Sequence, residues 1–95
     1  MPTSGVDAGI RLARLARALG HPARVAIVQF LRHQPTDVTC GEIVGQLPLA
    51  QSTVSEHLRV LVAAGLVVSQ AAPPRVRYRI DPRGLAELKR LAVEL

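Results

Sequence analysis

The sequence has one cysteine, few aromatic residues and no long apolar run, and each shortage excludes a class of protein or site. Its single cysteine, Cys40, excludes an intrachain disulfide, and any metal site would need ligands of other kinds. Phe30 and Tyr78 are its only aromatic residues, too few for the stacking platforms with which proteins hold single-stranded nucleic acid. No apolar run approaches the roughly 20 residues that cross a bilayer.

The start of the chain also lacks a targeting signal. Met1 to Asp7 have neither the basic beginning nor the apolar centre of a signal peptide, so we expect a soluble, cytoplasmic protein with no membrane partner. A hydrophobic content of 48% excludes a disordered chain. We expect one domain over residues 1–95, and because so short a chain buries little of its surface, association with a second copy would stabilise it.

Acidic residues are outnumbered by basic ones. Twelve Arg and Lys against 7 Asp and Glu give a formal net charge of +5. Such an excess favours a polyanionic partner such as nucleic acid. Because the aromatic platforms are missing, double-stranded DNA, held through its phosphates and read in its grooves, fits better than a single strand.

The apolar spacing and the helix start and stop signals predict an order of elements. After a frayed end at residues 1–5, helices are predicted over residues 6–19, 22–33 and 50–64, with a short helix before the third of these that begins in a capping box of Thr39 and Glu42. Strands are predicted over residues 66–69 and 75–80, followed by a last helix over 82–95. This order, ααααββα, is that of a winged helix-turn-helix: a mainly α fold with a small β-hairpin. Residues 39–64 would form the helix-turn-helix and residues 66–80 the wing.

The helix over residues 50–64 carries the main candidate site. At about 100° per residue, its apolar residues Val54, Leu58, Leu61 and Val62 form a buried stripe. The opposite face is polar and begins at the helix N-terminus, where free backbone N–H groups and the helix dipole attract phosphate. The predicted DNA-binding residues here are Gln51, Ser52, Thr53, Ser55, Glu56, His57 and Arg59, with His57 at the boundary of the face.

These side chains suit the reading of base edges. The short hydroxyl groups let the helix come close to DNA, and Arg59 could reach a guanine or a phosphate. Glu56 would repel phosphate, so it would either accept a bond from cytosine or orient Arg59. The alternative is a solvated face on a structural helix, which the capped helix and the Leu47-Pro48-Leu49 turn before it make the weaker interpretation.

A second basic element follows in the predicted wing. Arg75, Arg77 and Arg79 alternate along a strand, so all three point to one face and are predicted to bind DNA. Guanidinium groups in a row suit phosphate or a minor groove. The competing interpretation is that they only keep the strand soluble.

These segments resemble the ArsR/SmtB family of bacterial winged-helix repressors. The likeness lies in "ALGHPARVAIVQFL" at residues 18–31, where His21 replaces an acidic residue, and in "EIVGQLPLAQSTVSEHLRVLVAAGLV" at residues 42–67. The resemblance implies a sequence-specific, homodimeric DNA-binding transcriptional regulator, expected to be a repressor. The helices over 6–19 and 82–95 would form the dimer interface, and the fourth helices would enter successive major grooves of the operator.

The sequence departs from that family's pattern at the metal sites and at one helix cap. Thr39 and Gly41 stand where many members have a thiolate pair, and the last helix has carboxylates but no histidine, so no metal and no cofactor are expected. Ala50 stands where relatives commonly have a capping serine. Cys40 is expected to be a small, half-buried hydrophobic residue. The inducer, if one exists, is not identified.

Three alternatives to this function stay open. A metal-responsive nickel or zinc sensor would need a non-standard site, such as His21, His33 and His57 across a dimer. A winged helix used for protein interaction would lack the basic surface that this chain has. An enzyme is disfavoured because Ser55, Glu56 and His57, as neighbours on a helix, point about 100° apart and cannot form a nucleophile and base chain.

Overall fold

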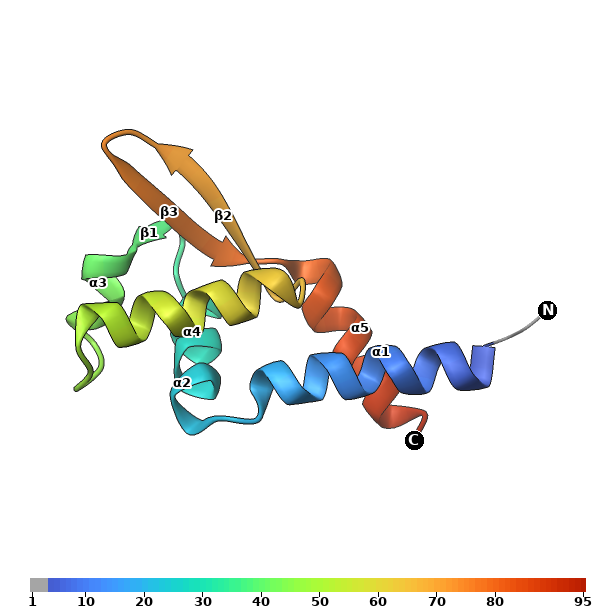
Figure 1. The fold of residues 1–95 in the computed structure, drawn as a ribbon. Helices are drawn as coiled ribbons and strands as arrows, with labels where there is room; N and C mark the ends of the chain where they lie inside the picture. Colours follow the sequence, from blue (N-terminus) through green and yellow to red (C-terminus); the bar gives the residue numbers. More distant parts are fainter. Residues whose placement is uncertain (1–3) are drawn as a thin grey trace.

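Figure 1 shows the computed structural model, which describes residues 4–95. Within this range the elements follow in the order α1 (Ser4–Leu19), α2 (Pro22–Arg32), β1 (Val38–Thr39), α3 (Cys40–Val44), α4 (Gln51–Ala63), β2 (Val67–Ala72), β3 (Arg75–Ile80) and α5 (Pro82–Val93). The predicted winged helix-turn-helix is therefore confirmed. Part of the expected frayed end, residues 1–3, lies outside the described residues, whereas Ser4 and Gly5 belong to α1.

Local capping explains where the early helices begin. His21 is the N-cap of α2, and its Nδ1 accepts a hydrogen bond of 3.1 Å from the backbone N–H of Ala23. The predicted capping box of α3 is present: Thr39 Oγ1 accepts from the N–H of Glu42 at 3.2 Å, and Glu42 Oε1 accepts from the N–H of Thr39 at 2.9 Å. These caps fix the helix that precedes α4.

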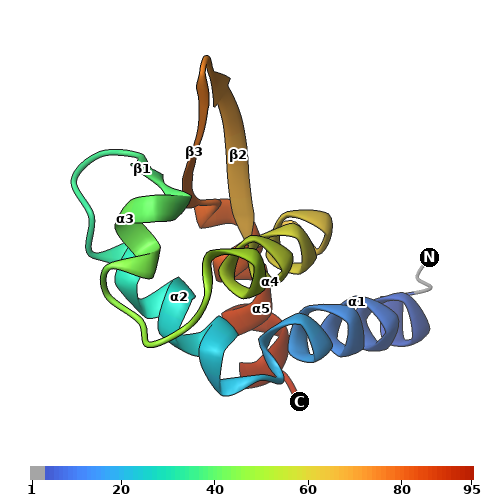
Figure 2. The ribbon, with the colours of Figure 1, turned by 60° about the vertical axis from the view of Figure 1, so that its left-hand side comes forward.

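The core forms around α4, which crosses the middle of the molecule (Figure 2). The largest fully buried side chains are Ile27 of α2, Ile43 of α3, Leu66, and Val54, Leu58 and Leu61 of α4. Three residues of the predicted buried stripe are thus confirmed, while Val62 is only half-buried. Burial of these side chains fixes the rotation of α4 about its axis and so determines which face is outside.

The sheet is larger than the predicted hairpin. β1 pairs with β3 through Val38 and Tyr78, and the strand order is β1-β3-β2, all antiparallel. β2 extends through Ala71 and Ala72, so the connection between the two predicted strands shortens to Pro73-Pro74. β1 is too short to show the alternating pattern of a strand in the sequence. Ala71 and Ala72 resemble a loop in the sequence, and they belong to β2 because β3 supplies their hydrogen-bond partners.

The turn that follows α4 is in direct contact with the start of α5. Gly65 has φ +84°, which favours glycine, and allows the chain to turn sharply from α4 into β2. The N–H of Asp81 donates to Leu66 O at 3.0 Å, and a Cβ placed on Gly84 would lie 1.8 Å from Gly65 O. Backbone therefore meets backbone at this junction with no room for a side chain.

Helix α1 projects from the body of the protein, as Figure 1 shows. The radius of gyration, 14.1 Å, exceeds the about 12.4 Å expected of a compact chain of this length. α1 packs against α5, where Arg11 Nε lies 2.7 Å from Glu87 Oε2. Val6 and Ile10 on α1 stay 73% and 53% exposed. None of the helices in residues 4–95 is long and apolar enough to span a membrane.

Candidate nucleic-acid interface

The outer face of α4 is polar and open to solvent. Six of its seven predicted DNA-binding residues are exposed: Gln51, Ser52, Thr53, Ser55, Glu56 and Arg59. On the opposite side of the same helix, Val54, Leu58 and Leu61 are completely buried. The structure therefore holds these six side chains on a surface fixed to the core.

Glu56 and Arg59 form an ion pair on this face. Arg59 Nε donates to Glu56 Oε1 at 3.2 Å, and Nη2 bonds to Oε2 in the same carboxylate. The pairing lowers the pKa of the Glu56 carboxyl and raises the pKa of the Arg59 guanidinium. Because a guanidinium has five N–H donors, others remain for a ligand. This geometry matches the orienting role predicted for Glu56.

The prediction that His57 faces DNA is wrong. Its side chain is only 9% exposed, and its ring centroid lies 4.5 Å from that of His21. At 100° per residue His57 lies closer to the buried stripe than to the polar face, and the start of α2 covers it. Ser55 and Glu56 are exposed while His57 faces inward, so the three side chains do not converge.

Two of the three histidines considered as metal ligands come together, but no cluster results. His21 already uses Nδ1 to cap α2, and His33 is the C-cap at the other end of that helix. Within residues 4–95, no group of three or more His, Cys, Asp and Glu side chains is arranged to hold a metal ion. Thr39 and Gly41 carry no thiolate or imidazole, so the start of α3 does not fit a zinc site either.

The burial of His57 predicts a loss of stability in mild acid. Desolvation lowers its pKa, and the nearby charges of His21 and Arg24 lower it further, against a smaller opposing effect of Glu56. The unfolded chain takes up a proton near the ordinary pKa of about 6.5, whereas the folded chain resists it. The stability contributed by neutral His57 is complete above that pH and is lost as the pH falls toward the pKa of His57 in the folded chain. Over this range the free energy of unfolding falls by at most about 1.4 kcal/mol per pH unit.

This dependence is measurable by urea unfolding between pH 7.5 and 5. We expect the free energy of unfolding to fall with pH in the unmodified chain and to fall less in His57→Leu, which has no group to protonate at that position. The same pH profile in both chains would contradict the assignment to His57.

Helix α4 begins without a side-chain cap. Ala50 has the extended geometry of an N-cap, φ −67° and ψ 152°, but no side chain accepts a hydrogen bond from the first turn. The free N–H groups of that turn lie beside the polar face of α4. N–H groups at an uncapped helix N-terminus can donate to a phosphate oxygen, and that such a contact forms here stays a prediction.

Restoring the cap is expected to stabilise the fold. Ala50→Ser should raise the free energy of unfolding by about 1 kcal/mol, because the backbone already has the geometry that lets a serine hydroxyl accept from the first turn. Chemical denaturation measures this, with Ala86→Ser, at an exposed position within α5, as the control. The control should be neutral or slightly destabilising. An equal response in both variants would contradict the missing cap.

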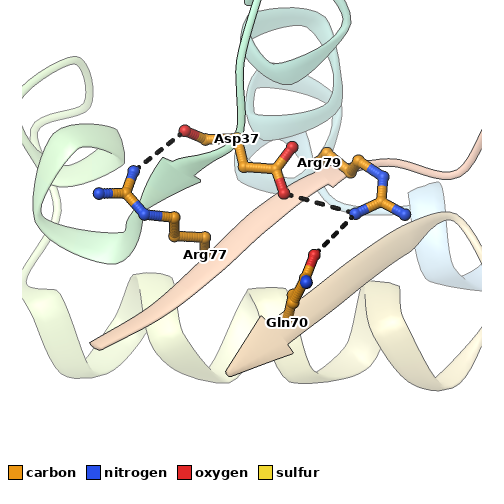
Figure 3. A network of polar contacts seen from close by, with 4 residues as sticks. All are labelled: Asp37, Gln70, Arg77 and Arg79. Carbon is orange, nitrogen blue, oxygen red and sulfur yellow. Dashed lines mark hydrogen bonds and ion pairs between the residues drawn. The ribbon is translucent and has the colours of Figure 1, made fainter. Parts of the chain in front are cut away.

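The wing carries its predicted arginines on an exposed strand, although two of them already have partners. Arg77 Nη1 donates to the backbone oxygen of Asp37 at 3.3 Å. Arg79 Nη1 donates to Asp37 Oδ2 and to Gln70 Oε1, both at 3.4 Å (Figure 3). Arg75, next to the turn, has no such bond within the described range. Sequence reasoning missed Asp37, which is far from the wing along the chain.

The polar face of α4 and the wing border one hollow of about 490 Å³. From α4 it is lined by Ser55, Glu56 and Arg59, and from the hairpin by Ser69, Val76 and Tyr78, among others. The apolar side of β3 therefore faces α4, while its arginines face away. The surface between the helix and the hairpin is concave.

Cys40 is half-buried, as predicted, at the start of α3. Its Sγ lies 3.9 Å from the backbone oxygen of Gln51, and burial raises the pKa of the thiol. A raised pKa reduces the thiolate fraction at neutral pH and thus the reactivity. The site gives Cys40 a packing role beneath the first turn of α4.

Comparison with known proteins identifies relatives of this architecture. A family described as "Helix-turn-helix domain" matches residues 19–70. The HTH-type transcriptional regulator Rv2034 of Mycobacterium tuberculosis is 43% identical over 76 residues, which cover 80% of this chain and 69% of that protein. The HTH-type transcriptional repressor SmtB of the same species is 40% identical over 74 residues, covering 78% of this chain and 53% of that protein.

A solved structure of another protein has the same fold as this chain. A possible transcriptional regulator for arsenical resistance superimposes with a TM-score of 0.77 and 34% identity, over 84% of this chain and 81% of that one. The chain spans about half to two thirds of the length of the two regulators above. The fold, the matched helix-turn-helix and these identities lead to one conclusion. The chain belongs to the ArsR/SmtB family of winged helix-turn-helix transcriptional regulators.

Proposed function

We propose that this chain binds a double-stranded DNA operator in a sequence-specific manner and represses transcription as a homodimer. The observation that carries the proposal is the exposed polar face of α4, which is held outward by three fully buried apolar residues and begins at an uncapped N-terminus. Short side chains at Ser52 and Ser55 let the helix approach base edges, and Arg59 reaches further. The exposed Arg75 of the wing would contact the backbone or a minor groove.

Dimerisation is supported by exposed apolar side chains on α1 and at the end of α5. Val6 and Ile10 are more than half exposed, and Val93 and Leu95 are 87% and 95% exposed. Exposed apolar side chains that lie together often mark a surface that another chain covers. A second copy covering them would place two α4 helices on one duplex, about one helical turn apart. Neither a metal nor another inducer is part of the proposal.

The test compares two duplexes. One is recovered by selection with this protein from a random pool, and the other has a scrambled sequence. Arg59→Ala should weaken binding to the selected duplex by about 1–3 kcal/mol, roughly 5- to 150-fold, because a lost base contact has that effect. Binding to the scrambled duplex should fall much less. Equal losses on the two duplexes would contradict base reading by Arg59.

A further inference from the structure

A second hollow lies on the opposite side of α4 from the wing. In Figure 1 the hairpin rises on one side of α4, while α1 and the start of α2 lie on the other. The hollow has a volume of about 430 Å³. We call it the arginine hollow, because its lining includes four arginines: Arg14 and Arg17 of α1, Arg24 of α2 and Arg59 of α4.

The charge of this hollow is not neutralised locally. No carboxylate lines it, and its other lining residues are alanines and Val60. Within residues 4–95, Arg14, Arg17 and Arg24 have no ion-pair partner, and only Arg59 is paired, with Glu56. Four guanidinium groups around one hollow therefore produce a concentrated positive potential.

One of these arginines also has a buried donor without an acceptor. Arg24 Nε is inaccessible to solvent and makes no hydrogen bond in the structure. A buried N–H of a charged group without a partner costs free energy, which an anion in the hollow would offset. Arg24 itself lines the hollow, so its guanidinium is close to any anion bound there.

The position of the hollow suggests which anion it meets. On the helical wheel of α4, Val62 lies about 80° to one side of the buried Val54 and Ala64 about 80° to the other. Val62 borders the wing hollow, and Ala64 borders the arginine hollow. A helix in the major groove has one DNA backbone on each side of it. The arginine hollow is on the flank that the wing cannot reach.

We propose that Arg14, Arg17 and Arg24 of the arginine hollow bind phosphates of the DNA backbone, on the strand that borders the groove opposite the wing. The inference rests on the proposed function, because α4 must enter the groove to bring this strand near. α1 would then contact DNA through its last two turns and extend the interface beyond the helix-turn-helix and the wing. Phosphate contacts of this kind add affinity without base preference.

The test uses salt dependence. Arg14→Gln with Arg17→Gln removes two exposed charges that make no bond within the described residues, so folding should be retained. Fluorescence anisotropy at 50–200 mM salt measures affinity for the selected and the scrambled duplex. Each phosphate contact contributes about 0.9 to the slope of log affinity against log salt, so the magnitude of the slope should fall by about 1.8 per protomer, or about 3.6 for a bound dimer, on both duplexes.

Arg32→Gln is the matched control, because Arg32 and Arg17 are both exposed arginines in the last turn of a helix. It should leave the slope near that of the unmodified chain. If the double variant and Arg32→Gln lower the slope equally per charge, the hollow makes no phosphate contact and the inference is overturned.

A small anion is the other source of the same chemistry. If the hollow binds a small anion and not DNA, inorganic phosphate at millimolar concentration should shift the side-chain NMR signals of Arg14, Arg17 and Arg24 in the DNA-free protein. The double variant should in that case keep the full salt slope of DNA binding. That combination would overturn the DNA contact. Absence of duplex binding by the unmodified chain at 50 mM salt would instead refute the proposed function, so the two failures are distinguishable.

Discussion

Gly84→Ala is expected to destabilise the fold by about 3 kcal/mol. An added Cβ would lie 1.8 Å from Gly65 O and 2.8 Å from Gly65 C, both backbone atoms that cannot rotate away. The start of α5 must therefore separate from the turn between α4 and β2, where the Asp81 N–H bonds Leu66 O. Overpacking of a tight contact costs about 1–3 kcal/mol and sometimes more. Alanine's better helix propensity offsets only part of this.

Thermal unfolding measures the effect. For a domain of this size, a loss of 3 kcal/mol corresponds to a midpoint lower by roughly 12–24 °C. Gly9→Ala is the control of opposite sign, because a Cβ there meets nothing within 4 Å and alanine favours the helix interior. It should raise the midpoint slightly. A neutral Gly84→Ala would contradict the close backbone contact on which the placement of α5 depends.

Ser52→Glu is expected to weaken specific DNA binding about a hundredfold or more while the fold stays intact. Ser52 is exposed in the first turn of α4, which contains no acidic residue. A carboxylate there interacts favourably with the helix dipole, so stability should stay the same or rise by up to about 1 kcal/mol. Against DNA, the same carboxylate would meet phosphates, and its longer side chain would hold the helix away. Like charges brought together cost several kcal/mol, so affinity should fall about a hundredfold or more.

The control separates local repulsion from net charge. Gln29→Glu makes the same charge change on the exposed side of α2 and should alter affinity by only a few fold. Anisotropy with the selected duplex measures both variants, and thermal unfolding verifies their folding. If Ser52→Glu binds as tightly as Gln29→Glu, the N-terminal turn of α4 does not face DNA.

The helices could be predicted from the sequence because their signals are local. The capping box at Thr39, the proline after His21 and the glycine after α4 each act within a few residues. The exposure of six polar residues on α4 also followed from periodicity alone, since Val54, Leu58 and Leu61 determine which side is buried.

The features that sequence reasoning missed depend on contacts between distant segments. β1 has two residues and exists because β3 supplies its partners. His57 lies toward the buried side of α4 by its helical angle, but it is buried only because the start of α2 packs against it. Asp37, which holds Arg77 and Arg79, is separated from them by about forty residues. Periodicity within one element does not contain this information.

The three arginines of the wing are not equally free to contact DNA. Arg77 and Arg79 are held at Asp37, so moving either to DNA requires breaking an existing bond. Arg75, which pairs with Ala72 next to the turn, has no such constraint. Exposed ion pairs are weak, so phosphate can compete for Arg79, but Arg75 reaches DNA without that loss.

The most direct test of the central claim is an NMR titration of the isotope-labelled protein with the duplex recovered by selection. If α4 reads DNA through its polar face, the largest amide shifts fall within residues 51–59, with a second group near Arg75. Val38 and the apolar end of α5 should change little. Shifts confined to α1 and α5, with residues 51–59 unaffected, would contradict the account.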